Sequence, residues 1–340
     1  MNVLVTGGAG YIGSHTCVEL LNAGHRVLVI DNLCRSNPEA LNRVRQITGK
    51  ELQFRRIDLL DYEPLLAASR EFSPDAVVHF AALKAVGESV SIPLTYYENN
   101  LTGTLNLCRA MSAVNCKNLV FSSSCTVYGN PARVPVTEAS PTQNAECPYG
   151  RTKLFIEEIL RDAAAADAAW HIALLRYFNP VGAHASGLLG EDPRGTPNNL
   201  LPYIALVAAG KLPELSVFGN DYPTPDGTCV RDYLHVVDLA KGHLAALDGL
   251  PRFAGARAWN FGTGAGVSVL EVIAAFASAS GQKIPYKIAP RRAGDVVATY
   301  ADPTRAREEL HWQAELSLAQ MCADVWRWQT QNPDGYQTRK

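Results

Sequence analysis

Long apolar runs, an excess of charge of either sign and spaced metal-ligand motifs are all missing from this 340-residue chain. A membrane-spanning helix needs about 20 consecutive, mostly apolar residues, so we expect no membrane partner. The 31 basic and 33 acidic residues leave a formal net charge of −2. Because this near balance provides no electrostatic attraction to nucleic acid, we expect no nucleic-acid partner either.

Cysteine and histidine are present but follow no pattern. The eight cysteines form no CxxC pair, which is typical of reduced thiols in a cytoplasmic protein. The eight histidines form no HxxxH or HExxH pair, so we predict no metal site and interpret His184, His235 and His243 as structural. The first strand is expected from residue 3, which leaves no room for a signal peptide. We therefore expect a cytoplasmic location.

Three glycines spaced three apart follow the first β-forming run of the chain. Gly7, Gly10 and Gly13 precede an amphipathic helix, and the next apolar run ends on Asp31. This order predicts a βαβ unit that binds a dinucleotide, with the pyrophosphate at the start of the helix. Asp31 would accept hydrogen bonds from the adenosine ribose and would repel a 2′-phosphate. The sequence thus favours NAD over NADP.

Apolar runs alternate with helical stretches along the first half of the chain. We expect further strands at 54–58, 76–80, 119–122 and 172–176. This rhythm predicts an α/β fold with a doubly wound, mostly parallel, Rossmann-type sheet and a smaller mixed α/β substrate domain. We expect an NAD-binding domain at 1–180, rejoined by about 235–262, and a second domain at 181–338.

Ligands of such sheets bind beyond the carboxyl ends of the strands. Five candidate residues are expected at such ends: Gly7, Asp31, Asp58, Phe80 and Ser124. For Asp58 the interpretation stays open between a contact to adenine and an ordinary role, as a helix N-cap or as a solvated loop acid.

Two helical regions flank the predicted catalytic residues. One carries Asn99 and Asn100 and runs to about Ala113. The other begins at Pro148, with Phe155, Ile156, Ile159 and Leu160 on its apolar face. Apolar residues on more than one face are consistent with a dimer interface or with packing inside one subunit.

Tyr149 and Lys153 lie four residues apart, on one face of the second helix. A free tyrosine titrates near pH ~10 and is a poor base at neutrality. A neighbouring ammonium and a bound nicotinamide cation would lower its pKa toward the working range. With Ser124 at the end of a strand, the pair would remove a proton from a hydroxyl whose carbon gives hydride to NAD.

These motifs make the chain similar to the extended short-chain dehydrogenase/reductase family: the glycine loop 7–13, Ser122-Ser123-Ser124, and Tyr149 with Lys153. Within the family the chain resembles enzymes that invert the C4 hydroxyl of a UDP-hexose. Stretches carrying this resemblance are 79–90, 122–129, 174–184, 197–203, 218–237 and 290–302. It implies interconversion of UDP-galactose and UDP-glucose through a 4-keto intermediate, with tightly bound, recycled NAD and a homodimer built on the two helical regions.

The resemblance also implies ligand contacts. For NAD they are Gly7, Gly10, Tyr11, Ile12, Gly13, Asp31, Asn32, Leu33, Cys34, Arg35, Ser36, Asp58, Leu59, Phe80, Ala81, Ala82, Leu83, Lys84, Asn99, Ser124, Tyr149, Lys153 and Phe178. For the UDP-sugar they are Lys84, Ser124, Tyr149, Asn179, Asn199, Leu200, Ser216, Val217, Phe218, Arg231, Tyr233, Val269, Arg292, Asp295 and Thr299. Two arginines suit a diphosphate and Phe218 offers an apolar wall for uracil.

Related chemistries remain as alternatives. Nucleotide-sugar 4,6-dehydratases carry an acid pair where this chain has Cys125-Thr126, and decarboxylases would need an acid at position 126. An NAD-sensing binding protein should lack Ser124, Tyr149 or Lys153. Thr299 is smaller than the tyrosine that some family members have there, so we expect UDP-N-acetylhexoses to be accepted as well.

Overall fold

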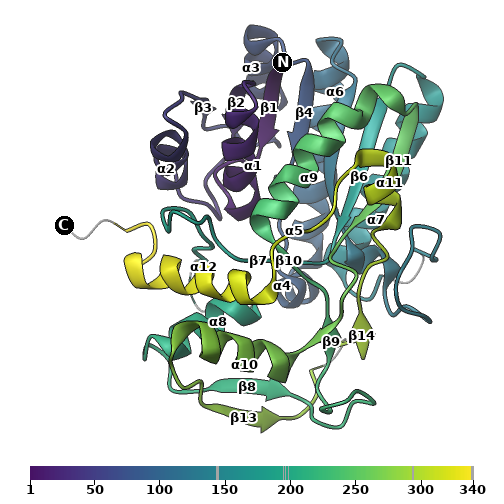
Figure 1. Cartoon of the computed structure of the whole chain (residues 1–340). Helices are drawn as coiled ribbons and strands as arrows, with labels where there is room; N and C mark the ends of the chain where they lie inside the picture. Colours follow the sequence, from purple (N-terminus) through teal and green to yellow (C-terminus); the bar gives the residue numbers. More distant parts are fainter. Residues whose placement is uncertain (143–144, 194, 196, 198, 293–294, 338–340) are drawn as a thin grey trace.

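The computed structural model describes residues 1–142, 145–193, 195, 197, 199–292 and 295–337 (Figure 1). Within these residues, a large sheet of seven parallel strands has the order β11-β6-β5-β4-β1-β2-β3. Its strands are β1 (Asn2–Thr6), β2 (Arg26–Ile30), β3 (Gln53–Arg55), β4 (Ala76–His79), β5 (Asn118–Ser124), β6 (His171–Tyr177) and β11 (Gly255–Phe261). The predicted doubly wound α/β sheet is confirmed.

Helices cover both faces of this sheet because its strands are apolar on both sides. One core cluster joins it to α1 (Tyr11–Asn22), α2 (Glu39–Thr48), α9 (Val236–Gly249) and α11 (Thr304–Leu310). The other joins it to α3 (Tyr62–Phe72), α6 (Gly103–Ala113) and α7 (Pro148–Ala166). Strand β1 lies between β2 and β4. The strand order runs from β1 through β2 to β3 on one side, and from β4 through β5 and β6 on the other. The glycine loop therefore follows the topological switch point of the sheet.

A smaller group of elements lies beneath the carboxyl ends of these strands in Figure 1. Its core is formed by α8 (Leu200–Ala208), α10 (Val269–Ser280) and α12 (Leu318–Gln331) with β8 (Leu215–Phe218). Its other strands are β7 (Asn179–Val181), β9 (Val230–Arg231), β10 (Tyr233–His235), β12 (Val267–Ser268), β13 (Tyr286–Ala289) and β14 (Ala298–Thr299). The division near residue 180 stays a prediction. Helix α9 and strand β11 lie with the large sheet.

The long helical region before β5 is broken where the sequence suggested continuity. It consists of α4 (Val86–Ser91), α5 (Pro93–Tyr97), a π-helix η1 (Glu98–Thr102) and α6. Pro93 begins α5, since proline ends the preceding hydrogen-bond ladder. Short 3₁₀ turns follow β5 at η2 (Cys125–Tyr128) and α9 at η3 (Leu250–Arg252).

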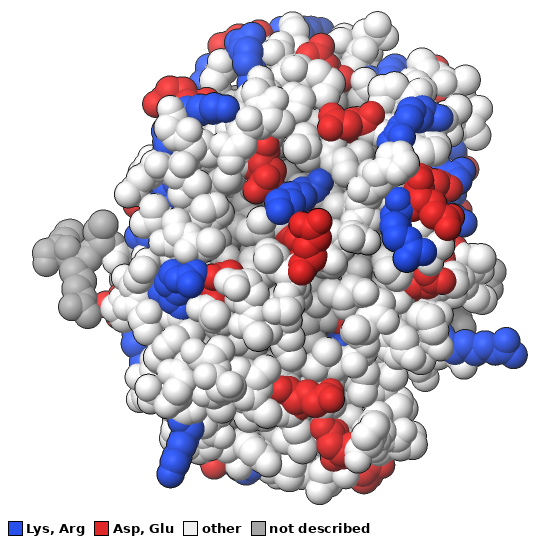
Figure 2. Space-filling view, in the orientation of Figure 1, with Lys and Arg blue, Asp and Glu red and all other residues white. Residues whose placement is uncertain are grey.

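The apolar face expected for α7 is corrected at one position. Ile156 and Leu160 are buried, but Phe155 is exposed and stacks on Tyr97 of α5, with ring centroids 6.1 Å apart. On the face shown in Figure 2, basic and acidic side chains are interspersed rather than segregated. None of the helices in the described residues has the length and apolar character that crossing a membrane requires.

Candidate active site

The glycine loop has the geometry that a dinucleotide requires. Gly7 has φ +71°, and a Cβ there would lie 2.6 Å from the backbone nitrogen of Ala81. A Cβ on Gly13 would lie 2.4 Å from the Gly7 carbonyl oxygen. Gly7 thus lets the chain turn against the end of β4, and Gly13 lets α1 approach the loop. Because Gly10 caps α1 without a side-chain hydrogen bond, the first N–H groups of the helix suit a pyrophosphate.

Asp31 connects the end of β2 to the glycine loop. Its carboxylate accepts hydrogen bonds from Ala9 N at 3.1 Å, Leu33 N at 2.9 Å and Ser36 Oγ at 2.8 Å. These contacts hold the 32–36 loop beside the phosphate loop, and Oδ2, which accepts only the bond from Ala9 N, retains a lone pair for a ribose hydroxyl. The residues present therefore fit NAD.

Asp58 belongs to the same loop cluster. It accepts a hydrogen bond from Asn32 Nδ2 at 2.8 Å and from Leu60 N at 3.0 Å. Asp61, not Asp58, is the N-cap residue of α3, so the N-cap interpretation of Asp58 was wrong. Contact between Asp58 and adenine stays a prediction.

Asn100 is a site residue that the sequence interpretation passed over in favour of Asn99. Its side chain accepts from Leu83 N at 2.8 Å and donates to the Leu83 carbonyl and to Thr152 Oγ1, both at 3.0 Å. It thus fixes the 80–84 loop to α7. The π-turn of η1 is located at these residues, where such turns are frequent in functional sites.

The three predicted catalytic residues meet at the end of β5. Ser124 is the N-cap of η2 and accepts hydrogen bonds from Thr126 N at 3.2 Å and Thr126 Oγ1 at 3.0 Å. Lys153, which is buried, donates to the Ser122 carbonyl at 2.5 Å and lies 4.8 Å from the ring centroid of Phe121. The Tyr149 side chain lies close enough to Ser124 to interact with it.

Burial acts on the protonation of both Tyr149 and Lys153. It raises the pKa of Tyr149 well above its ordinary value, although the interaction with Ser124 offsets part of the shift. The lowering expected from Lys153 together with a bound nicotinamide cation stays a prediction. Burial also lowers the pKa of Lys153 to about 7, against an opposing contribution from the Glu157 carboxylate. The lysine, rather than the tyrosine, is the group shifted to neutrality.

Several predicted sugar-nucleotide residues lie together across β9, β14 and the 290s loop. Arg231 and Thr299 are paired in register. Arg231 Nη2 contacts Asp295 Oδ1 at 3.4 Å, and the Arg292 guanidinium lies over the Phe218 ring, 4.5 Å from its centroid. This cluster combines cations for a diphosphate with an aromatic wall.

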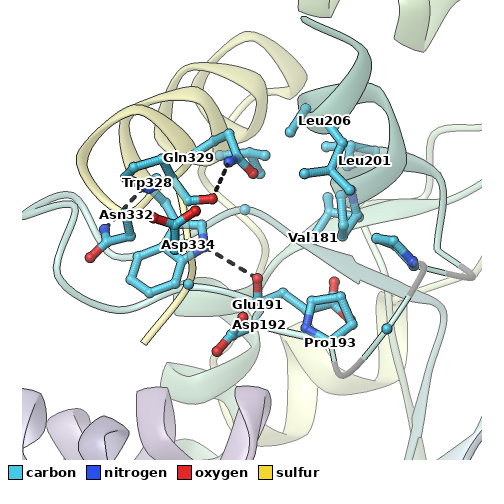
Figure 3. Close-up of a pocket in the computed structure, with 18 residues that line it drawn as sticks. Val181, Glu191, Asp192, Pro193, Leu201, Leu206, Trp328, Gln329, Asn332 and Asp334 are labelled. Atoms are coloured by element: carbon cyan, nitrogen blue, oxygen red, sulfur yellow. Dashed lines mark hydrogen bonds between the residues drawn. The ribbon is translucent and has the colours of Figure 1, made fainter. Parts of the chain in front are cut away.

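Two further predicted residues are joined by an acid that the sequence interpretation missed. Glu191 Oε1 accepts from Asn199 Nδ2 at 2.7 Å and is 3.4 Å from Lys84 Nζ. Glu191 also lines a cavity of about 150 Å³ between α8 and α12 (Figure 3). Ser124, Tyr149 and Lys153 do not line this cavity.

The remaining predicted residues have mixed surroundings. Asn179 pairs with Tyr233 between β7 and β10, while the side chain of Val217 lies in the core of the smaller group. Phe80 packs against His243 with the rings tilted by 52° and the centroids 4.7 Å apart, and Phe178 packs beside Tyr128. Leu59 lies in a core cluster, and Arg35 pairs with Glu88.

The histidines have structural partners. His235 Nε2 is 3.3 Å from Asp324 Oδ2, and His243 bonds the Leu239 carbonyl at 2.8 Å. Among the described residues, no group of three or more histidine, cysteine or acidic side chains could hold a metal ion.

Comparison with known proteins places this geometry in a family. Residues 3–262 match the NAD dependent epimerase/dehydratase family. The chain is 60% identical over 338 residues to UDP-glucose 4-epimerase of Bacillus subtilis, covering 99% of each. It is 55% identical to the UDP-glucose 4-epimerase of Bifidobacterium longum solved in complex with NAD+ and UDP, with TM-score 0.96 and coverage of 98% and 100%.

A solved UDP-Glc/GlcNAc 4-epimerase from Campylobacter jejuni is also similar, at 39% identity and TM-score 0.85, with coverage of 97% and 99%. The predictions of an epimerase and of NAD as its cofactor are confirmed by these relatives. The chain belongs to the NAD dependent epimerase/dehydratase family.

Proposed function

We propose that this chain interconverts UDP-galactose and UDP-glucose by reversible oxidation at C4 of the sugar. The observation that carries the proposal is the grouping of Ser124, Tyr149 and Lys153 at the end of β5. Strand β5 is the direct neighbour of β4 in the sheet, and the glycine loop packs against the end of β4. A hydroxyl bound to this group would have a base and a hydrogen-bond donor on one side and the nicotinamide beside it.

The proposed steps divide between the two groups of elements. In the proposed step Tyr149 acts as a phenolate, the form that the Lys153 ammonium and a bound nicotinamide cation would both favour. It takes the proton of the sugar 4-hydroxyl, and Ser124 donates a hydrogen bond to the same oxygen as it becomes a carbonyl. NAD held by the glycine loop would supply a reversible hydride acceptor for C4, so that the hydride could return to the opposite face after the keto sugar has turned over. Arg231 and Arg292 hold the diphosphate throughout, so the anchoring contacts are separate from the reacting carbon.

The direct test is conversion without added cofactor. Purified chain is mixed with UDP-galactose alone, and UDP-glucose is measured. We expect conversion, because NAD is recycled and co-purifies. In Tyr149→Phe we expect retained NAD and turnover lowered by roughly 100- to 10,000-fold, the usual worth of acid–base help. Near wild-type turnover in that variant would reject the mechanism.

The same assay separates the alternative chemistries. A 4,6-dehydratase needs an acid beside the serine, but Ser124 is followed by Cys125 and Thr126, and Thr126 donates to Ser124 instead. We therefore expect no 4-keto-6-deoxy product.

UDP-N-acetylhexoses are proposed as further substrates. Thr299, with its short side chain, lies opposite Arg231 in the β14–β9 pair, within the proposed sugar-nucleotide cluster. Turnover of UDP-N-acetylglucosamine is expected in wild type, and Thr299→Tyr should lose it while keeping UDP-galactose turnover. Good UDP-galactose turnover without any N-acetyl turnover in wild type would reject this proposal.

A homodimer is proposed on the surface formed by α4 to α7. This surface exposes Val90, Leu94, Leu105 and Phe155, with Leu94 80% exposed. Apolar side chains gathered this way favour an interface. Leu94→Asp should shift the mass measured by light scattering from dimer to monomer, whereas a monomeric wild type would reject the proposal. A cytoplasmic location stays a prediction from the sequence.

A further inference from the structure

Three consecutive serines at the end of β5 contact three different residues of α7. The Ser122 carbonyl accepts from Lys153 at 2.5 Å, and Ser124 lies beside Tyr149. The middle serine donates its hydroxyl to Glu157 Oε1 at 2.6 Å. Glu157 lies one helical turn beyond Lys153, and the proposed mechanism gives it no role.

Glu157 is the centre of a buried ionic network. Its side chain is 0% exposed, and Arg176 of β6 contacts it through two nitrogens, at 2.9 and 2.6 Å. Arg161 donates a further hydrogen bond at 2.9 Å. A buried charge pair is tolerable only when its hydrogen bonds are satisfied. One carboxylate therefore binds β5, β6 and α7 together.

The charge of Glu157 acts on Lys153. Glu157 opposes the lowering of the lysine pKa that burial causes. His79 of β4, on the other side, is neutral at physiological pH because burial lowers its pKa to about 3. Burial also raises the pKa values of the two neighbouring tyrosines. The titratable and charged groups around the pair are His79, Tyr149, Tyr177, Glu157, Arg161 and Arg176.

We propose that Glu157 is a positioning residue for the catalytic pair. Held by Ser123 and Arg176, its carboxylate fixes α7 against the end of β5 and supplies a negative charge that favours the ammonium form of Lys153. This inference rests on the proposed roles of Tyr149 and Lys153. Glu157 thereby influences the protonation of Lys153 without any contact to NAD or to the sugar in the proposed mechanism.

The test is the pH dependence of kcat in Glu157→Gln, which keeps the side-chain volume and an acceptor for Ser123. Without the carboxylate charge, Lys153 should lose its proton at lower pH. The alkaline limb of the profile should then move down by about one pH unit, with the KM for UDP-galactose unchanged. Reduction of bound NAD by substrate, followed by near-ultraviolet absorbance, should shift in the same way. An unshifted limb in a folded variant would overturn the proposal, even if stability fell.

Ser123→Ala keeps every charge and removes only the tether to β5, so it decides the question if Glu157→Gln does not fold. Its kcat should fall by about tenfold through misplacement, with KM unchanged, and a wild-type kcat would overturn the proposal. Arg161→Gln, at a partly exposed contact of Glu157, is the matched control and should keep the wild-type limb. A downward shift there equal to that of Glu157→Gln would also overturn it.

Lys153→Met distinguishes a failure of the proposed catalytic mechanism from a failure of the proposed role of Glu157. Its loss of turnover supports the proposed mechanism, so that a normal profile in Glu157→Gln would then remove the role of Glu157 alone. Wild-type turnover in Lys153→Met would instead refute the mechanism itself.

Discussion

Replacing Gly7 by alanine tests whether the first glycine is required for conformation alone or for close approach as well. Gly7 has φ +71°, and its Cβ would lie 2.6 Å from a backbone nitrogen of the 80–84 loop. Gly24, at the end of α1, is the matched control: its φ is +83°, but a Cβ there would meet nothing within 4 Å. Both variants carry the conformational penalty, and only Gly7→Ala carries the clash.

The structure sets the expected size of each effect. A left-handed alanine costs about 1–2 kcal/mol, and overpacking against rigid backbone adds about 1–3 kcal/mol. For a chain of this length, 1 kcal/mol lowers Tm by roughly 1.5 °C, from the usual unfolding entropy per residue. We expect Gly24→Ala to lose about 1.5–3 °C and Gly7→Ala about 3–7 °C.

Two measurements complete this test. Thermal melts give the loss of Tm, and the absorbance of NAD released on denaturation gives the cofactor content per chain. Gly7→Ala should contain less NAD than wild type, because the shifted loop moves the N–H groups that face the phosphates, whereas Gly24→Ala should retain a full complement. Equal melting temperatures and equal NAD contents in the two variants would show that the close approach at Gly7 has no effect on stability or on NAD binding.

Two other predictions follow from buried polar groups. Asn100→Ala should remove the side-chain partner of the Leu83 N–H and carbonyl and one hydrogen bond of Thr152, so kcat should fall and urea stability should drop by about 1–3 kcal/mol; unchanged kinetics would show that the loop is held elsewhere. Burial lowers the pKa values of His15 and His79 to about 3 and that of His243 to about 4. Because the unfolded chain binds these protons near pH 6.5, stability is fully present above that pH and is lost as pH falls toward the folded pKa values. Urea midpoints across pH 7 to 5 should therefore decline, and less steeply in His79→Gln; identical slopes would contradict this.

The order of elements could be predicted from the sequence because each carries its own local pattern. The run before Gly7 is apolar and β-forming, and glycine spacing has a direct meaning for φ and for close approach. The same locality explains why Tyr149, Lys153 and Ser124 could be selected. Their residue types and their positions at the ends of predicted elements were enough to assign them to one site, without any knowledge of the distances between them.

The sequence did not allow us to predict which way individual side chains point or which groups they contact. Asn99 and Asn100 are adjacent and chemically identical, and the π-turn that orients Asn100 toward the 80–84 loop depends on the tertiary contacts that Asn100 itself makes. Phe155 was assigned to the buried face because helical spacing identifies a stripe but not its limits. The raised pKa of Tyr149 has a related origin: spacing indicated the nearby ammonium, but burial is a property of the packed site.

The three serines at the end of β5 contact both the proposed catalytic residues and Glu157. Ser122 uses its backbone and Ser124 its hydroxyl for groups that act directly in the proposed reaction. Ser123 uses its hydroxyl for a buried carboxylate that acts on Lys153 through space. Because successive side chains of a strand point to opposite faces, Ser123 faces α7, as Phe121 does, and reaches Glu157 with its side chain, whereas Ser122 reaches Lys153 through its backbone carbonyl. The Glu157 network and the catalytic pair are therefore coupled by the geometry of β5 itself, and a change that shifts this strand end should affect kcat and its pH dependence together.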